Sequence, residues 1–390
     1  MNFDKIISRR GTYCTQWDYI SDRFGKNDIL PFSISDTDFE VPEEVTKVLI
    51  KRINHPIFGY TRWNHADYKN AIAYHYKKRF GQNINRNGIV YSPSVMYSIS
   101  VLIRLLSNEN DGIMVFDPMY DAFIDVIKKN HRKLVTVNLD NENNYSVDFN
   151  DFEKKLKKCK ILLLCSPHNP TGKVFSRSEL LNIVNICKKY SVYIISDEIH
   201  SDITLYNNKH YPIISYIGEY KNIVLVNSSS KTFNTPSIGG SYAIIHDKQL
   251  YNQFLEQTRK RDFVNSANVL GMLALMESYE KCDYYIDELT KYIEKNMDYT
   301  EKFLNEKLPM IKFIKPQATY LAWFDISNLN CSSEKFQDIL VNIAKVGIMS
   351  GETYGKNGAM HLRMNLGCPI CKLEEGLKRL EKAVTVLMEG

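Results

Sequence analysis

The sequence predicts an α/β fold with a large three-layer αβα domain, built on a mostly parallel seven-stranded sheet, and a smaller α+β domain after it. Short apolar runs alternate with amphipathic stretches through the middle of the chain, which is the pattern of repeated strand–helix–strand units. A length of 390 residues allows two or three domains. A content of 44% apolar and 24% charged residues is typical of a globular protein and excludes a disordered or collagen-like chain.

Seven apolar runs are the predicted strands of the large sheet. They occupy residues 88–92, 113–117, 134–139, 161–165, 193–196, 223–227 and 242–245. Between the fourth and fifth runs, Ser176 and Glu179 have the spacing of a capping box, in which each side chain satisfies a free backbone donor of the first helical turn. Leu180, Val184 and Cys187 then repeat at helical spacing, so we expect one stripe of that helix to pack on the sheet.

The sequence divides into an amino-terminal arm, a large domain and a small domain, with predicted ranges 1–45, 46–285 and 286–390. The arm is irregular and rich in Asp, and we expect it to contribute to the small domain. A long, charged, tyrosine-rich helix over 283–307 leads out of the large domain and ends before Pro309. The small domain then has predicted strands over 318–325 and 360–366, and predicted helices over 333–346 and from 372 onward.

Charge and composition exclude several classes of protein. Lys and Arg (50) nearly cancel Asp and Glu (45), so the overall charge gives no reason to expect a nucleic-acid partner. The amino terminus lacks the apolar core of a signal peptide, and the apolar runs are far shorter than the roughly 20 residues that span a bilayer. Eight cysteines are too few for a disulfide scaffold, and Cys368 and Cys371 have no second pair nearby that would complete a metal site. We therefore expect a cytoplasmic protein with no membrane or metal partner.

Residues with catalytic potential follow three consecutive predicted strands. They are Asn169 in the loop 166–172, Asp197 and His200 in the run 197–200, and Lys231 after three serines. In open α/β sheets, ligands bind beyond the carboxyl ends of the strands. We therefore expect an amide, a carboxylate, an imidazole and an amine to share one crevice.

Pyridoxal 5′-phosphate suits this set of groups. A lysine that forms a Schiff base must spend time unprotonated, although a free lysine has a pKa of about 10.4, and a buried site lowers that value. The ring nitrogen of the cofactor needs a carboxylate partner, for which Asp197 is the candidate. Its phosphate needs backbone donors and hydroxyls. The candidates are the backbone at Val95 and Met96, where a helix is predicted to begin, and the hydroxyls of Ser228 and Ser230.

These motifs resemble the fold type I pyridoxal-phosphate enzymes of the class I and II aminotransferase superfamily. Within that superfamily, several segments are similar to the cystathionine β-lyase, or C–S lyase, branch. They are residues 58–62, 197–202, 230–234, 318–323 and 363–369. The resemblance runs from about Gly11 to the carboxyl end, and it implies a homodimer with shared active sites that acts on a small amino acid.

The resemblance implies a role for each matching residue around the cofactor. Lys231 forms the Schiff base and later acts as general base, and Asp197 pairs with the pyridine nitrogen. Asn169 and His200 contact the phenolic oxygen, where many aminotransferases have a tyrosine in place of this histidine. Tyr120 stacks on the cofactor ring and belongs to the catalytic set with Lys231 and Asp197.

The resemblance also assigns a substrate residue and a contact between subunits. Strand alternation over 360–366 puts Arg363 on the polar face of its strand, where its fork can bind the substrate α-carboxylate. Tyr60 reaches the phosphate and substrate of the neighbouring subunit. Two positions depart from the family pattern: Gly239 stands where many relatives have a basic residue, and Ser94 stands where this branch usually has glycine.

The substrate pocket is predicted from aromatic residues near the motifs. They are Phe39, Tyr60, Trp63, Tyr120 and Tyr320, with Arg62 as a candidate for binding a distal carboxylate. Lys173 is the rival for the Schiff base, but it lies outside any serine-lined strand end, and we expect it to face solvent.

The first hypothesis for the reaction is a C–S β-lyase that cleaves cystathionine or other S-substituted cysteines to pyruvate, ammonia and a thiol. An aminotransferase acting on an aromatic or aliphatic L-amino acid is the alternative, because both reactions begin with removal of the Cα proton. A third hypothesis is a regulatory binding protein, because some members of this branch also bind a transcription factor.

Overall fold

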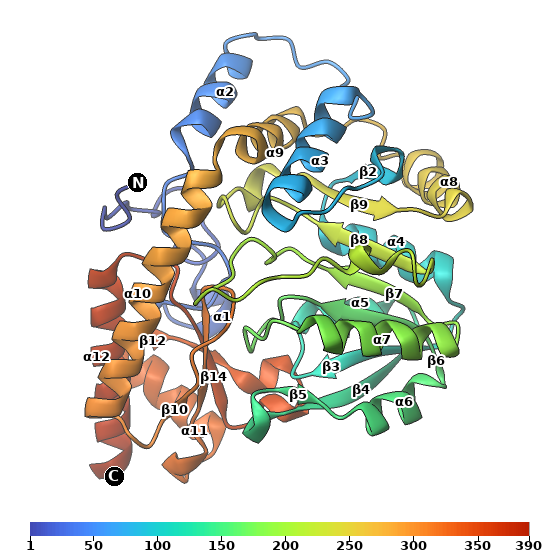
Figure 1. Cartoon of the computed structure of the whole chain (residues 1–390). Coiled ribbons are helices and arrows are strands. Elements are labelled where there is room, and N and C mark those ends of the chain that lie inside the picture. The colour runs from blue at the N-terminus through green and yellow to red at the C-terminus, as the bar shows by residue number, and fades with distance from the viewer. Residues whose placement is uncertain (390) are drawn as a thin grey trace.

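A computed structural model describes residues 1–389 and confirms the α/β fold (Figure 1). Among these residues, eight strands form the large sheet, in the order β2-β9-β8-β7-β6-β3-β4-β5. The strands are β2 Ile89–Ser92, β3 Gly112–Asp117, β4 Lys133–Asp140, β5 Ser146–Val147, β6 Cys159–Cys165, β7 Tyr193–Asp197, β8 Ile223–Asn227 and β9 Ser241–Ile245. The sheet is mostly parallel, as predicted.

The predicted number of seven strands was one too low. The additional strand, β5, has two residues and pairs antiparallel with the end of β4 at the edge of the sheet. Two residues are too few to produce the alternation by which a strand is recognised in a sequence. Strand β9 also runs antiparallel to both of its neighbours, β2 and β8.

Helices cover both faces of this sheet, so the large domain has three layers (Figure 1). Helices α4, α5 and α8 lie on one face, and α6 and α7 lie on the other. The described helices are α1 Ser21–Phe24, α2 Glu43–Ile53, α3 Ala66–Phe80, α4 Val95–Leu106, α5 Asp121–Lys129, α6 Phe149–Leu156, α7 Arg177–Lys189, α8 Lys248–Glu256, α9 Val269–Lys281, α10 Asp283–Lys307, α11 Ser333–Asp338 and α12 Ile370–Glu389.

The start of α7 confirms the predicted capping box. The Ser176 hydroxyl accepts from the Glu179 backbone N–H at 3.2 Å, and the Glu179 carboxylate accepts from the Ser176 backbone N–H at 2.8 Å. Leu180, Val184 and Cys187 are buried, so the predicted stripe of α7 does pack on the sheet.

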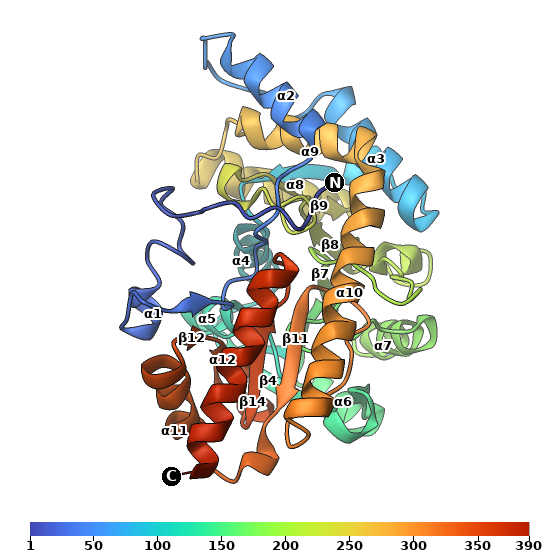
Figure 2. The same ribbon diagram turned by 90° about the vertical axis from the view of Figure 1, so that its left-hand side faces the viewer.

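The small domain contains a second sheet, in the order β10-β11-β14-β13. Its strands are β10 Lys312–Phe313, β11 Leu321–Asp325, β13 Met349–Ser350 and β14 His361–Asn365. Helices α10 and α12 pack side by side next to this sheet (Figure 2). Helix α10 has the bounds predicted for it. The helix predicted over 333–346 continues beyond α11 as a π-helix to Ala344 and ends at Lys345, whose φ of 61° is left-handed.

The amino-terminal arm contacts the carboxyl-terminal part of the chain. Its strand β1, Leu30–Pro31, pairs parallel with β12, Val346–Gly347. The arm then crosses to the large domain, where the Asn234 amide donates to the carbonyls of Thr37 and Phe39, both at 2.9 Å. The domain boundaries after residues 45 and 285 stay predictions. Within residues 1–389, no helix has both the length and the apolar character needed to cross a membrane.

Helix α9 packs closely against the turn that follows Lys231 in the chain. A Cβ atom at Gly271 would lie 2.2 Å from the Gly239 carbonyl oxygen and 2.6 Å from that of Ile238. The Gly240 carbonyl accepts from the Ser228 hydroxyl at 2.6 Å. Because Gly271 has no side chain, α9 can contact this turn directly. The same turn contacts Ser228, which follows β8.

Replacing Gly271 by Ala should lower stability, although alanine is preferred to glycine by about 1 kcal/mol within an ordinary helix. The new Cβ would force α9 or the turn to move, and we expect the free energy of unfolding to fall by roughly 1–3 kcal/mol, measured by urea denaturation. Gly218→Ala is the matched control, because a Cβ there meets nothing within 4 Å. Equal stability of the two variants would contradict the close packing of α9.

Candidate active site

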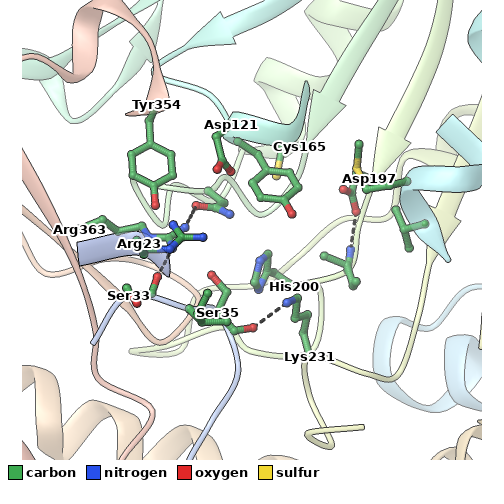
Figure 3. Close-up of a pocket in the computed structure, with 16 residues that line it drawn as sticks. Arg23, Ser33, Ser35, Asp121, Cys165, Asp197, His200, Lys231, Tyr354 and Arg363 are labelled. Carbon is green, nitrogen blue, oxygen red and sulfur yellow. Dashed lines mark hydrogen bonds between the residues drawn. The ribbon is translucent and has the colours of Figure 1, made fainter. Parts of the chain in front are cut away.

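A cavity of about 170 Å³ lies at the carboxyl ends of β6, β7 and β8, where the arm and the small domain meet the large sheet (Figure 3). Most of the predicted site residues line it. They are Val95, Met96, Tyr120, Asn169, Asp197, His200, Lys231 and Arg363. The parallel direction of β6, β7 and β8 accounts for this convergence, because the residues after all three strands meet at one edge of the sheet.

The amine of Lys231 points into the cavity and donates to the backbone carbonyl of Ser35 at 2.6 Å (Figure 3). The surrounding protein removes water from this amine, which lowers the pKa of Lys231, and the nearby Arg363 lowers it further against the opposing effects of Asp36 and Asp197. A carbonyl acceptor aims the amine without neutralising it. The arrangement therefore favours a reactive, partly deprotonated amine.

The carboxyl group of Asp197 lies buried at the end of β7. One of its oxygens accepts from the Ile199 backbone N–H at 3.1 Å. Burial raises the pKa of Asp197 to about 7, although the Ile199 bond and Lys231 both lower it. Across residues 1–389, no basic side chain lies within 4 Å of this carboxylate, so a cation placed against it would hold it ionised.

Arg363 is buried and is held by neutral acceptors from two other parts of the chain. One terminal nitrogen donates to the Asn169 side-chain oxygen at 3.0 Å, and the other donates to the Ser33 carbonyl at 2.7 Å. The guanidinium carbon lies 4.6 Å from the centre of the Tyr354 ring. Its Nε has no hydrogen-bond partner in the described chain. A buried guanidinium without a carboxylate partner is suited to binding an anion.

His200 is neutral in this environment. Burial lowers the pKa of its imidazole to about 3, and the positive charges of Lys231 and Arg363 lower it further. The Nδ1 atom of His200 is buried without a partner among residues 1–389. A neutral imidazole has one N–H to donate and one nitrogen to accept, so it can bind a ligand oxygen without adding charge.

The loop 166–172 positions Asn169. The Gly172 backbone N–H donates to the His168 carbonyl at 2.7 Å, and the His168 imidazole lies 2.9 Å from the Thr171 hydroxyl. Because the Asn169 side-chain oxygen accepts from Arg363, its NH₂ group is the part left to donate to a ligand.

The predicted phosphate residues lie near the amino terminus of α4, but the two serines do not line the cavity. Ser94 caps α4 by accepting from the Tyr97 backbone N–H at 3.1 Å, which leaves the helix terminus suited to an anion. The Ser228 hydroxyl accepts from the Ser230 backbone N–H at 3.2 Å. Gly239 has a φ of 67°, which a basic side chain adopts only with strain, so a glycine suits this backbone.

Tyr60 lies outside the cavity in this chain, with a relative exposure of 100%. Phe39, Trp63 and Tyr320 also do not line it, because they are buried in the core and pack on other side chains. Of the predicted aromatic residues, Tyr120 alone borders the cavity in the described chain. Burial raises the pKa of Tyr120 to about 12, so its hydroxyl stays protonated.

The prediction that Lys173 faces solvent was wrong. The side chain is 7% exposed, and its amine lies 2.8 Å from the carboxylate of Glu179. That carboxylate also completes the capping box of α7, so it is fixed in a position that draws Lys173 inward. The lysine also covers the ring of Phe175. It does not line the cavity.

Several residues that line the cavity could not be found from the sequence motifs. They are Arg23, Ser33, Ile34 and Ser35 from the arm, Asp121 from α5, and Tyr354 from the small domain. Arg23 lies in the four-residue helix α1, and residues 33–35 lie in no helix or strand, so neither segment is long enough to show a periodic pattern. Asp121 directly follows the predicted Tyr120, and this adjacency was the one available signal.

The sequence and the structure both match known proteins over nearly their whole length. The chain is 38% identical to the protein MalY of Escherichia coli strain K12 over 387 residues, which cover 98% of each chain. It is 36% identical to the cystathionine beta-lyase PatB of Bacillus subtilis strain 168 over 389 residues, which cover 99% of this chain and 100% of PatB.

A crystal structure of the PLP-bound C–S lyase from Staphylococcus hominis superposes on 99% of each chain, with a TM-score of 0.91 and 30% sequence identity. The family profile described as aminotransferase class I and II matches residues 27–380. These residues include the strands and loops that form the cavity. The chain therefore belongs to the class I and II aminotransferase family.

Proposed function

We propose that this protein is a pyridoxal-phosphate-dependent C–S β-lyase that cleaves cystathionine or other S-substituted cysteines to pyruvate, ammonia and a thiol. The observation that carries the proposal is the cavity itself, in which Lys231, Asp197 and Arg363 face one space. Whole-length similarity to a cystathionine β-lyase and to a C–S lyase supports this reaction over transamination. The aminotransferase alternative is less favoured for that reason.

The residues present fit pyridoxal 5′-phosphate. Asp197 would hold the protonated ring nitrogen, because its buried carboxyl group lacks a nearby cation in the described chain. Asn169 and His200 would contact the phenolic oxygen, and Tyr120 would lie on the ring. The phosphate would lie at the amino terminus of α4, near Val95 and Met96, with Ser228 and Ser230 behind it. When bound, the cofactor supplies an electron sink for the charge that develops at the substrate Cα.

The protein residues perform the acid–base and binding steps. Arg363 binds the substrate α-carboxylate through its fork, which Asn169 and the Ser33 carbonyl already orient. The amine of Lys231 removes the Cα proton, and its lowered pKa leaves a larger neutral fraction for this step than an ordinary lysine has. The Cβ–S bond then breaks and the sulfur leaves as a thiolate. With one water consumed, the products are thiol, pyruvate and ammonia.

A homodimer accounts for an exposed apolar patch outside the cavity. We define the apolar patch as Ile57, Phe58, Tyr60 and Phe263, which are 68%, 56%, 100% and 75% exposed. The two loops that carry it are tied together, since the Thr61 backbone N–H donates to the Ser266 hydroxyl at 2.8 Å. An ordered apolar patch favours burial against a second copy, in which Tyr60 would reach the partner's phosphate. A cytoplasmic location and a regulatory protein partner stay predictions of the sequence alone.

The reaction is tested by incubating the purified holoenzyme with L-cystathionine in the absence of any keto acid. A lyase should release pyruvate and free thiol in equal amounts, measured with lactate dehydrogenase and a thiol reagent. An aminotransferase consumes a keto acid in each cycle and should stop after one turnover. Keto-acid-dependent turnover without release of thiol would overturn the proposed function.

Lys231→Ala should abolish covalent attachment of the cofactor. Borohydride reduction of the parent protein should fix one cofactor on the peptide that contains Lys231, measured by mass spectrometry. Lys173→Met is the matched control and should keep the attachment, because Lys173 pairs with Glu179 outside the cavity. A reduced adduct in the Lys231 variant would show that another amine carries the cofactor.

Mixed dimers test whether Tyr60 serves the neighbouring subunit. A heterodimer of a Lys231→Ala chain and a Tyr60→Ala chain has one site with both lesions and one intact site if the site is shared. We therefore expect the purified heterodimer to have about half of the parent activity, far above either mutant homodimer. Activity no higher than half that of the Tyr60→Ala homodimer would place Tyr60 at its own subunit's site or remove it from the site.

A further inference from the structure

Two oppositely charged side chains line the cavity without belonging to the groups assigned so far. Arg23 and Asp121 both border the space that contains Lys231 and Arg363 (Figure 3). Within residues 1–389, neither side chain lies within 4 Å of an oppositely charged group. A cation and a carboxylate that share a cavity without pairing with each other can bind a ligand that carries both charges.

Arg23 extends from α1, a short helix of the arm. One of its terminal nitrogens lies 3.1 Å from the Met349 sulfur, which is a weak acceptor. Its other N–H groups have no acceptor among the described residues. Two contacts fix the backbone around Arg23. The Gly25 N–H donates to the Ser21 carbonyl at 2.7 Å, and the next strand, β1, pairs with β12. The Arg23 guanidinium therefore has N–H groups free to bind a ligand, on a side chain whose backbone is held in place.

Asp121 is the first residue of α5 and directly follows Tyr120. Its carboxylate accepts no hydrogen bond from the part of the chain that the structure describes. The acid lies on the same side of the cavity as the Tyr354 ring in Figure 3.

Tyr354 also lines the cavity, and its ring contacts the buried Arg363. Burial raises the pKa of its hydroxyl to about 12; Arg363 lowers that value, Asp121 raises it, and Arg23 lowers it. All three charged groups therefore act on one phenol. The guanidinium of Arg363 packs on one face of that ring, at 4.6 Å. The cavity thus has an inner cation, Arg363, and an outer pair of opposite charges, with Tyr354 among them.

We propose that Arg23 and Asp121 form a second amino-acid subsite, which binds the carboxylate and the ammonium at the far end of the leaving group. The preferred substrate is then an S-substituted L-cysteine whose thiol part itself ends in an α-amino acid, as in L-cystathionine or L-cystine. This inference rests on the proposed function, because Arg363 must bind the α-carboxylate of the residue that is cleaved. It replaces Arg62, which does not line the cavity, as the candidate for the distal carboxylate.

The charges explain why such a substrate would be selected. Arg363 and Arg23 can each bind one of the two carboxylates, and Asp121 can bind the distal ammonium but repels a distal carboxylate. A substrate with an uncharged tail makes neither of these ionic contacts. It is still cleaved, but without the gain in binding energy that the two contacts supply. Arg23 therefore selects substrates with a distal carboxylate, and Asp121 independently selects substrates with a distal ammonium.

Four substrates with the same three-carbon tail separate these contributions. They are L-cystathionine, S-(3-carboxypropyl)-L-cysteine, S-(3-aminopropyl)-L-cysteine and S-propyl-L-cysteine. Arg23→Gln should lower kcat/KM by roughly fivefold to tenfold for the two substrates with a distal carboxylate. Asp121→Asn should lower it by a similar factor for the two substrates with a distal ammonium. Arg23→Glu should make the aminopropyl substrate clearly better than the carboxypropyl substrate, because both outer side chains are then acidic.

Binding without turnover provides a second readout. The uncleavable carbon analogue of cystathionine, 2,7-diaminosuberate, should inhibit the parent holoenzyme competitively, and Arg23→Gln should raise its inhibition constant by roughly the same fivefold to tenfold. Lys26→Gln is the matched control, because Lys26 is exposed three residues further along and does not line the cavity.

The outcomes separate this subsite from the proposed function. If the parent enzyme cleaves neither cystathionine nor S-propyl-L-cysteine, the proposed lyase fails. If it cleaves both and the Arg23 and Asp121 variants lose all four substrates equally, or none, the lyase stands and the subsite is overturned. A selective loss of carboxylate substrates in Arg62→Gln, with none in Arg23→Gln, would also overturn it.

Discussion

Two backbone carbonyls of one short segment hold the two basic groups at the centre of the site. The Ser33 carbonyl accepts from Arg363 of the small domain, and the Ser35 carbonyl accepts from Lys231 of the large domain. The two carbonyls belong to residues only two apart in the chain, so the distance between them sets the distance between the two basic groups. Carbonyls are neutral, so Arg363 keeps its charge for a ligand and Lys231 gains no carboxylate partner that would hold its amine protonated. The arm is thus a structural part of the site.

The site also carries buried charges that the protein alone does not balance. Asp197 has a carboxyl group whose pKa is raised to about 7, and Arg363 has a buried nitrogen with no partner among residues 1–389. Uncompensated buried charges reduce the stability of the folded protein. The two groups have opposite charges and lie at separate places in one cavity. Asp197 suits a cationic ring nitrogen, and Arg363 suits an anionic carboxylate. The groups whose burial costs stability would then add to the stability of the folded protein when these ligands bind.

The sequence was sufficient to predict the fold class, the end of α10 and several residues that line the cavity, because consecutive parallel strands bring the residues after them to one edge. Asn169, Asp197 and Lys231 follow that rule. The rule could not predict Arg23 or Tyr354, which reach the cavity from short helical turns outside the large sheet. The prediction that Lys173 faces solvent failed for a related reason, because the burial of this side chain depends on its contact with the fixed carboxylate of Glu179. Strand β5 was missed because a two-residue strand has no period.

The left-handed backbone at Gly239 has a consequence for how the enzyme keeps its cofactor. A basic side chain at this position would strain the turn by roughly 1–2 kcal/mol, so the chain cannot easily supply a cation there to neutralise the phosphate. In the proposed assembly, the Tyr60 hydroxyl of a second copy donates a hydrogen bond to the phosphate instead. Cofactor retention then depends on protein concentration, and dilution below the dimer dissociation constant should release the cofactor along with the partner subunit.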